Sequence, residues 1–314
     1  MRLRNIALSF AAVTVFYGIA LFFLDIKANS LDGIKNTLQF LPMLMLLTFM
    51  SFILRYIRWY WLLMTAGYTV PFLAGFSFYL SGFALTASPG KIGELLRIRY
   101  FQYVNVPASI TISAFVFERA CDLLVVLLLG LFAASAFDFF PLIAVAIITI
   151  LLCLLTLAYK PTYLRYCIYF LYKLHLRKSA HFFKLLVKGI SGINCWMTPS
   201  RVFISIVLGG LAWLVLSLSF IWLLSSFNVD VDWLPALSIY PIAMLAGALS
   251  MLPGGIGSTE ATIITQLVYY DVPLVLAGMA AISIRITTIW FAIFCGVAMV
   301  ILLEFKMLHT KKST

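Results

Sequence analysis

Two carboxylates of this chain are each followed by an arginine at the same distance. Glu94 and Arg119 are separated by as many residues as Glu260 and Arg285. All four lie in strongly apolar sequence. A charge at the centre of a bilayer costs about 2.5–3.5 kcal/mol, so it is rare there without a partner or a role. The pattern predicts that each carboxylate pairs with Arg119 or Arg285 and faces a central polar cavity.

A Pro-Gly turn comes before each carboxylate. The first copy reads SPGKIGE at 88–94, and the second reads LPGGIGSTE at 252–260. Proline cannot continue a helix, and glycine adopts turns closed to other residues, so helices should break here. Paired breaks of this kind in corresponding halves of a membrane protein point to a transport site. The predicted turn residues are Pro89, Gly90, Gly93, Pro253, Gly254, Gly255 and Gly257.

A structural interpretation competes with the functional one at both turns. The glycines also suit a tight turn needed only for packing. Glu94 and Glu260 would then cap the helix that follows, since a helix N-terminus favours a negative charge. A similar choice applies to Arg58, which precedes Trp59 near the end of an apolar run and would snorkel to the interface if it had no internal partner.

Further charges occupy the same apolar stretches. Glu118 and Asp122 are four residues apart and share a helical face, and Arg97 is three residues after Glu94, which makes it a helical neighbour. Arg285 is the only charge inside its long expected helix, so it needs an acidic partner. We expect these charges to form one coherent set.

The composition identifies the elements that must position these residues. The chain has 314 residues, of which 64% are apolar and only 11% are charged, whereas a soluble domain has roughly 25% charged residues. Apolar runs long enough to span a bilayer, at about 20 residues, recur along it. The chain is therefore predicted to be an all-α polytopic membrane protein. The expected spanning helices are 6–24, 40–64, 109–135, 139–159, 202–225 and 272–303.

Charge asymmetry predicts the orientation. No acidic residue occurs between Asp138 and Asp230, an interval that carries eight basic residues. By the positive-inside rule, the connector at about 160–201 and both termini are expected in the cytoplasm, with the protein in the cytoplasmic membrane. The parity of the spans then makes 72–103 and 234–270 re-entrant hairpins. Eight full crossings are the alternative, because both stretches are nearly long enough to cross.

The hairpins imply an inverted repeat within a single integral membrane domain, 1–314. Repeat A covers about 40–135 and repeat B about 202–303, with opposite topology and the basic connector between them. Broken backbone at membrane depth is tolerated only where it is buried in protein or lines a wet cavity. The Pro-Gly turns are therefore expected at the tips of the two hairpins.

No cofactor or metal site is expected. Three cysteines fall in apolar runs, and Cys167 and Cys195 lie in the basic connector without CxxC spacing. The three histidines lie in charged segments. The net charge of +11 follows the positive-inside pattern and gives no separate support for nucleic-acid binding.

Four motifs follow one another along the chain: RYIRW at 55–59, the block 81–97, FERACDLL at 117–124 and LPGGIGSTEA at 252–261. Together they resemble the flippase-like family, the transmembrane region of lysylphosphatidylglycerol synthases, which also occurs as stand-alone proteins. The resemblance implies a lipid translocase fold with two re-entrant hairpins and a cavity for a phospholipid or lipid-linked headgroup. By position, it implies the polar site residues Arg58, Glu94, Arg97, Glu118, Arg119, Asp122, Glu260 and Arg285.

The chain departs from the bifunctional members of that family, which carry a soluble aminoacyl-transferase domain after the membrane part. This sequence ends at Thr314, shortly after the last expected helix, so we expect no lysyl transfer by this chain and no enzyme activity. Its two turn motifs also differ from the residues often found in relatives, at Lys91 and at Ser258-Thr259, which leaves the headgroup open.

Three functions are compatible with these features. The favoured one is a translocase for membrane lipids with anionic or phosphate-bearing headgroups. The second is a non-transporting scaffold or regulator of a separate lipid-modifying enzyme. The third is a membrane-embedded transferase, which is less favoured because buried Glu–Arg pairs suit binding better than acid catalysis. The sequence indicates no oligomeric state.

Overall fold

The computed structural model describes residues 31–131 and 192–312, with scattered positions between 141 and 156. Every regular element in these residues is helical, which confirms the all-α class. The expected first helix at 6–24, most of the expected helix at 139–159 and most of the basic connector lie outside the described residues.

The first half consists of two long helices joined by a broken segment. α2 covers Leu31–Thr65, beginning earlier than the expected residue 40, and α5 covers Ala108–Gly130. Pro89 starts a 3₁₀ segment because its ring fixes φ and removes the N–H that a continuing helix would use. The short elements between the long helices are α3 (Phe72–Ser81), 3₁₀ segments at Gly82–Leu85 and Pro89–Leu96, α4 (Arg97–Phe101) and a 3₁₀ turn at Gln102–Val104.

The second half has the same order of elements. α9 covers Pro199–Ser226, and a broken segment leads to a final long stretch. The single helix expected at 272–303 is two helices joined by a π-helical turn. After α9 come α10 (Trp233–Leu249), a 3₁₀ turn at Pro253–Gly255, α11 (Ser258–Tyr269), α12 (Leu274–Arg285), the π turn at Ile286–Trp290 and α13 (Phe291–Lys312).

Helix lengths separate spanning elements from hairpin limbs. By length and composition, Gln39–Thr65, Pro199–Ser226 and Leu274–Met307 can each cross a membrane. α5 has 23 residues but carries three charges in its middle. The limbs before the Pro-Gly turns are shorter: α3 with the 3₁₀ segment that continues it covers Phe72–Leu85, and α10 covers Trp233–Leu249. At 1.5 Å per α-helical residue and about 2.0 Å per 3₁₀ residue, these are about 23 and 26 Å, against a hydrocarbon core of about 30 Å. The lengths favour re-entrant hairpins over eight crossings.

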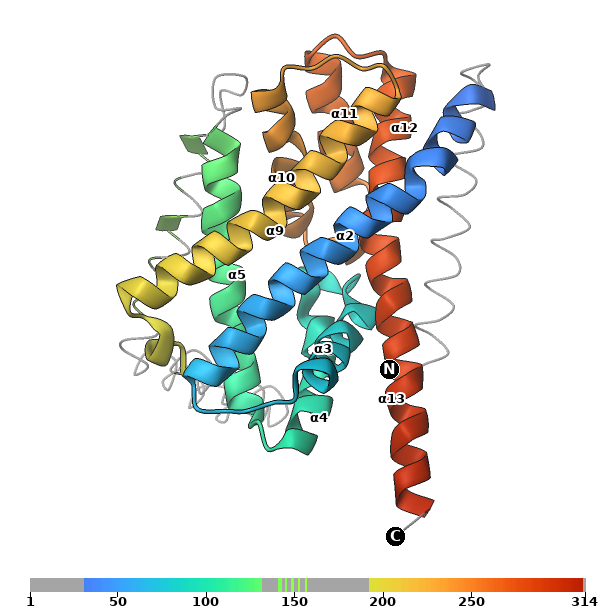
Figure 1. Ribbon diagram of the computed structural model, residues 1–314. Coiled ribbons are helices and arrows are strands. Elements are labelled where there is room, and N and C mark those ends of the chain that lie inside the picture. The colour runs from blue at the N-terminus through green and yellow to red at the C-terminus, as the bar shows by residue number, and fades with distance from the viewer. Residues whose placement is uncertain are drawn as a thin grey trace, which may run out of the picture.

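The two halves run in opposite directions (Figure 1). α2 and α9 pack side by side and antiparallel, and α5 runs opposite to α12 and α13. The two hairpin tips meet, because the 3₁₀ segment Pro89–Leu96 contacts the turn Pro253–Gly255. This antiparallel arrangement of the halves is the one that the predicted inverted repeat requires.

The last helix, α13, packs against the first half of the protein. α13 belongs to the second half by sequence, yet it packs along α3 and the 3₁₀ segment after it. Gly296 makes this approach possible, because a Cβ there would lie 2.1 Å from the backbone nitrogen of Ala84. The core beneath the first half is rich in aromatic rings, whereas that of the second half is mostly aliphatic. The aromatic core includes Trp59 and Tyr79, which lie against the charged residues described below.

The halves also share backbone detail at a fixed spacing. Asn105 and Asp271 both adopt left-handed backbone, with φ of 60° and 59°. In each case the next residue donates its N–H to the carbonyl five residues earlier, at 3.1 Å. The separation between Asn105 and Asp271 equals the separation between Glu94 and Glu260. The repetition therefore extends from the sequence to the helix caps.

Candidate functional site

Both expected carboxylate–guanidinium pairs form within their own halves. Arg119 Nη2 donates to Glu94 Oε2 at 3.3 Å, and Arg285 Nε donates to Glu260 Oε1 at 2.7 Å. The Arg285 side chain is fully buried, while 13% of the Glu260 side chain remains exposed. Arg285 Nη2 also donates to the carbonyl of Gly254, which fastens the guanidinium to the Pro-Gly turn.

The two carboxylates differ in their second role. Glu260 Oε2 accepts the backbone N–H of Gly257 at 2.7 Å at the start of α11, so the capping interpretation is correct for Glu260. Glu94 lies inside a 3₁₀ segment and caps no helix. Its carboxylate accepts hydrogen bonds from Thr86 Oγ1 at 2.9 Å and from Arg97 Nη2 at 2.6 Å. Glu94 is 1% exposed, which makes it the buried centre of the first hairpin.

Arg97 fastens the first hairpin to the aromatic core. Its Nε donates to the Glu94 carbonyl at 2.9 Å, in addition to the bond to the Glu94 carboxylate. Its guanidinium carbon lies 4.5 Å from the Trp59 ring centroid and 4.4 Å from that of Tyr79. Cation–π contacts gain strength when desolvated, and Arg97 is fully buried. The sequence did not reveal these two aromatic partners.

Arg58 joins two carboxylates of α5. Its Nη2 donates to Glu118 Oε1 at 2.8 Å and its Nη1 to Asp122 Oδ1 at 2.9 Å. Arg58 is fully buried, so the snorkelling interpretation is wrong: its Nη1 and Nη2 donate to internal carboxylates, and the guanidinium does not reach the interface. Arg55, which was not among the expected site residues, adds a 3.1 Å bond to Asp122.

This cluster has more positive than negative charge. It contains five basic side chains and three acidic ones, an excess of two positive charges. The acidic members are Glu94, Glu118 and Asp122, and each is bonded to arginine. Among the described residues, the Lys91 ammonium group makes no ion pair or hydrogen bond. The site therefore favours an anion.

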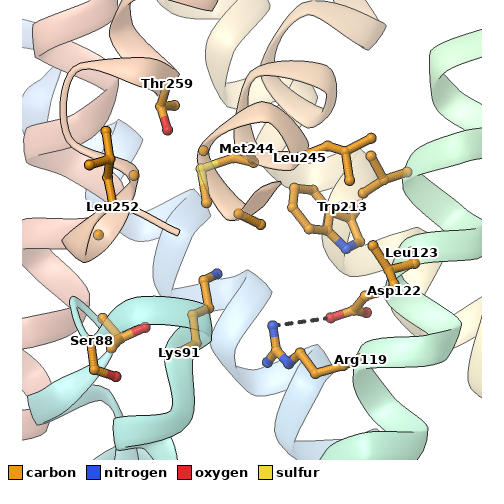
Figure 2. A pocket seen from close by; sticks show the side chains of 16 residues that line it. Ser88, Lys91, Arg119, Asp122, Leu123, Trp213, Met244, Leu245, Leu252 and Thr259 are labelled. Atoms are coloured by element: carbon orange, nitrogen blue, oxygen red, sulfur yellow. Dashed lines mark ion pairs between the residues drawn. The ribbon is translucent and has the colours of Figure 1, made fainter. Parts of the chain in front are cut away.

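A cavity of about 230 Å³ lies where the hairpin tips meet, beside these charges. Lys91, Arg119 and Asp122 form its charged side, with the Lys91 side chain directed into the open space (Figure 2). Leu252 and Met244 face them from the other hairpin. The remaining lining includes Thr86, Ser88, Leu123, Val126, Trp213, Leu245, Gly247, Ala248, Gly254, Gly255 and Thr259. The cavity thus has one charged side and one apolar side.

A smaller cavity of about 70 Å³ shares part of this lining. Lys91, Arg119, Trp213 and Met244 border both spaces. The smaller one also reaches Glu94, Arg55 and residues of the π-helical turn after Arg285. A π turn inside a helix often marks a functional position. Charged residues of the first hairpin therefore border cavities that residues of both halves line.

The expected site residues thus fall into three groups. Arg119 and Asp122 line the larger cavity and Glu94 the smaller one. Arg58, Arg97 and Glu118 lie behind them and hold them in place. Glu260 and Arg285 line neither space and fasten the second hairpin. The predicted turn residues all lie in the two turns. Gly254, Gly255 and Gly257 have positive φ, of 64°, 65° and 85°. Gly93 donates its N–H to Ser88 Oγ at 2.6 Å, and 3₁₀ segments contain Pro89, Gly90 and Pro253.

No cluster of His, Cys, Asp and Glu suited to a metal ion occurs in the described ranges 31–131 and 192–312. The polar atoms at the cavity are instead hydrogen-bond donors and cations. They can bind, orient and neutralise an anionic group.

Comparison with known proteins identifies the family. Residues 6–296 match the family described as the lysylphosphatidylglycerol synthase TM region. The chain belongs to this family. The match confirms the resemblance carried by the four motifs, and a multi-pass membrane location follows from it together with the apolar helices.

One curated relative of this lysylphosphatidylglycerol synthase TM-region chain is a UPF0104 membrane protein from Methanothermobacter thermautotrophicus. The two are 31% identical over 118 residues. The aligned part covers 36% of this chain and 35% of the relative, so about a third of each protein is compared.

Proposed function

We propose that this chain is a translocase that moves a phospholipid or lipid-linked headgroup across the cytoplasmic membrane. The cavity between the two hairpin tips carries this proposal, because it combines surplus positive charge with an apolar wall. A lipid offers an anionic headgroup to the first and hydrocarbon to the second. The proposed orientation keeps both termini and the basic connector in the cytoplasm.

Alternating access between the halves would move the headgroup. The halves are antiparallel and each contributes one hairpin tip to the cavity. Substrate and ion sites at the junction of inverted repeats, formed by broken helices, are typical of transporters. In this proposal, rocking of one half against the other opens the cavity first to one face and then to the opposite face, with the Glu–Arg pairs keeping each hairpin rigid.

Transport by purified protein tests the proposal. Proteoliposomes would hold a fluorescent anionic phospholipid, and a membrane-impermeant quencher would report which headgroups face outward. We expect Glu94→Gln and Arg285→Ala to abolish movement while the proteins remain folded. Arg99→Met is the matched control, because Arg99 pairs with Glu304 at an exposed site. Headgroup movement at the wild-type rate in both buried-charge variants would contradict the proposal.

A scaffold for a separate lipid-modifying enzyme is the second candidate. It predicts that loss of function follows the basic connector and not the buried charges. A transferase is less favoured. An Asp-x-Asp triplet of the kind used by nucleotide-sugar enzymes occurs at Asp230-Val231-Asp232, but it lies between α9 and α10 and lines neither cavity. We therefore propose binding and movement without covalent chemistry.

A further inference from the structure

Lys91 occupies a backbone position that favours glycine. Its φ is 56°, in the left-handed region, and Gly255 at the same point of the second Pro-Gly turn has φ of 65°. In both turns this residue donates its N–H to the carbonyl three residues earlier, at 2.9 Å. Glycine adopts this conformation without strain, whereas a lysine does not. Strained residues persist mainly at functional sites, so the backbone strain at Lys91 indicates that its side chain has a function.

That side chain provides an uncompensated cation inside the cavity. Its ammonium group points into the open space (Figure 2) and makes no ion pair with any described residue. The two nearby carboxylates are already bonded to arginines: Glu94 to Arg97 and Arg119, and Asp122 to Arg58 and Arg55. The lysine is therefore available to a ligand.

Other donors around the same cavity are also unused. The Trp213 indole N–H and the Arg119 Nε–H are buried and have no hydrogen-bond partner among the described residues. Trp213 is only 5% exposed. The Thr259 hydroxyl, from the second hairpin, likewise lacks a partner there. A buried donor without an acceptor is costly, so several donors facing one cavity indicate an acceptor-rich ligand.

We infer that Lys91, Arg119 and Trp213 form a binding site for a phosphate group. A phosphate has oxygen acceptors in several directions, which matches donors that come from the first hairpin, from α5 and from α9. The cavity volume of about 230 Å³ far exceeds the ~10–15 Å³ that one water needs. The apolar wall at Leu252 and Met244 provides room for the glycerol and first methylenes of a lipid.

This inference rests on the proposed function only for the source of the phosphate. The group would belong either to a membrane lipid or to a soluble phosphate compound. The apolar wall favours the lipid. Binding in detergent does not require transport, so the site and the translocase can fail separately.

Binding to purified full-length protein in detergent tests the site. Intrinsic tryptophan fluorescence would be recorded while dihexanoyl phosphatidic acid, dihexanoyl glycerol or inorganic phosphate is added. We expect saturable binding of phosphatidic acid, none of the phosphate-free diacylglycerol, and an affinity at least tenfold weaker in Lys91→Gly and Lys91→Met. Binding of inorganic phosphate with the same dependence on Lys91 would support a phosphate site with a soluble ligand.

Thermal stability separates loss of the site from loss of the fold. Lys91→Gly removes the backbone strain together with the charge, so its melting temperature should rise above that of wild type. Lys91→Met removes the charge and keeps the strain, so its melting temperature should not rise as far. Phosphatidic acid should raise the melting temperature of wild type and of neither variant. Unchanged phosphatidic acid binding in a folded Lys91→Gly protein would overturn the inference.

If the lysine variants lose binding while wild type moves no lipid, the phosphate site stands and the translocase proposal fails. If wild type moves lipid and Lys91→Gly binds phosphatidic acid normally, the translocase stands and the phosphate site fails.

Discussion

Replacement of Arg58 by methionine should strongly destabilise the fold. Arg58 donates one hydrogen bond to Glu118 at 2.8 Å and another to Asp122 at 2.9 Å, and its side chain is 0% exposed. Hydrogen bonds to charged groups contribute roughly 1.5–3 kcal/mol each, and breaking a buried ion pair by removing one partner costs about 3–5 kcal/mol. Because Tyr79 still donates to Glu118, we expect a loss of about 3–5 kcal/mol in unfolding free energy, and not more.

Two further variants calibrate this value. Arg58→Lys keeps the charge but lacks the planar fork that reaches two carboxylates at once. Its loss should be that of one hydrogen bond to a charged group, about 1.5–3 kcal/mol. Arg99→Met breaks an ion pair of 3.0 Å whose side chains are 55% and 36% exposed, and exposed pairs contribute about 0–1 kcal/mol. Chemical unfolding in mixed micelles, followed by circular dichroism, gives all three values. If Arg58→Met cost no more than Arg99→Met, the reasoning about desolvated charges would be refuted.

Three other predictions concern packing, caps and topology. Gly209→Ala should destabilise the protein, because its Cβ would lie 2.3 Å from Arg58 Nη1. The control Gly210→Ala places a Cβ with nothing within 4 Å and should be neutral or stabilising. Melting curves of the two variants measure the difference, and equal effects would contradict the packing at Gly209. Asp271→Ala should lose about 1 kcal/mol and Asp271→Gly should not, because φ there is 59°; equal unfolding free energies would argue against the left-handed cap. An impermeant maleimide should label a single-cysteine protein at the solvent-accessible Cys195 only from the cytoplasmic side. Labelling should need alkaline pH, because partial desolvation by its neighbours raises the pKa of this thiol; labelling from outside would reverse the topology.

The sequence predicted the features that depend on local chemistry and spacing. Prolines and glycines marked both hairpin tips. The equal spacing within the two Glu–Arg motifs predicted that the carboxylates pair with Arg119 and Arg285 but left open which arginine meets which carboxylate, and the structure decides this. That spacing had a physical basis, because the segment from carboxylate to arginine contains a helical limb, a left-handed cap and the start of the next helix in both halves. The limb is partly 3₁₀ in the first half and wholly α-helical in the second. The matching Asn-Val-Pro and Asp-Val-Pro caps at 105–107 and 271–273 are a further sequence signal of the same repeat.

Features that depend on packing between distant segments could not be predicted. The sequence around Arg58 fits a side chain that snorkels to the interface and one that is buried in a charged network, and only the contact with α5 decides between them. The stacking of Arg97 on Trp59 and Tyr79 combines α2, α3 and α4. The π turn after Arg285 has no glycine or proline to mark it. The cavity around the Lys91 ammonium group is lined by segments that are distant in the sequence, so the sequence did not mark Lys91 as a site residue.

The measurement that tests the central claim most directly is headgroup accessibility in proteoliposomes that contain a labelled anionic phospholipid, with wild type beside Glu94→Gln. The proposed translocase predicts headgroup movement that depends on the protein and disappears in the variant, while circular dichroism shows the variant folded. The absence of movement by wild type across a panel of phospholipids and lipid-linked sugars would contradict it and favour a scaffold.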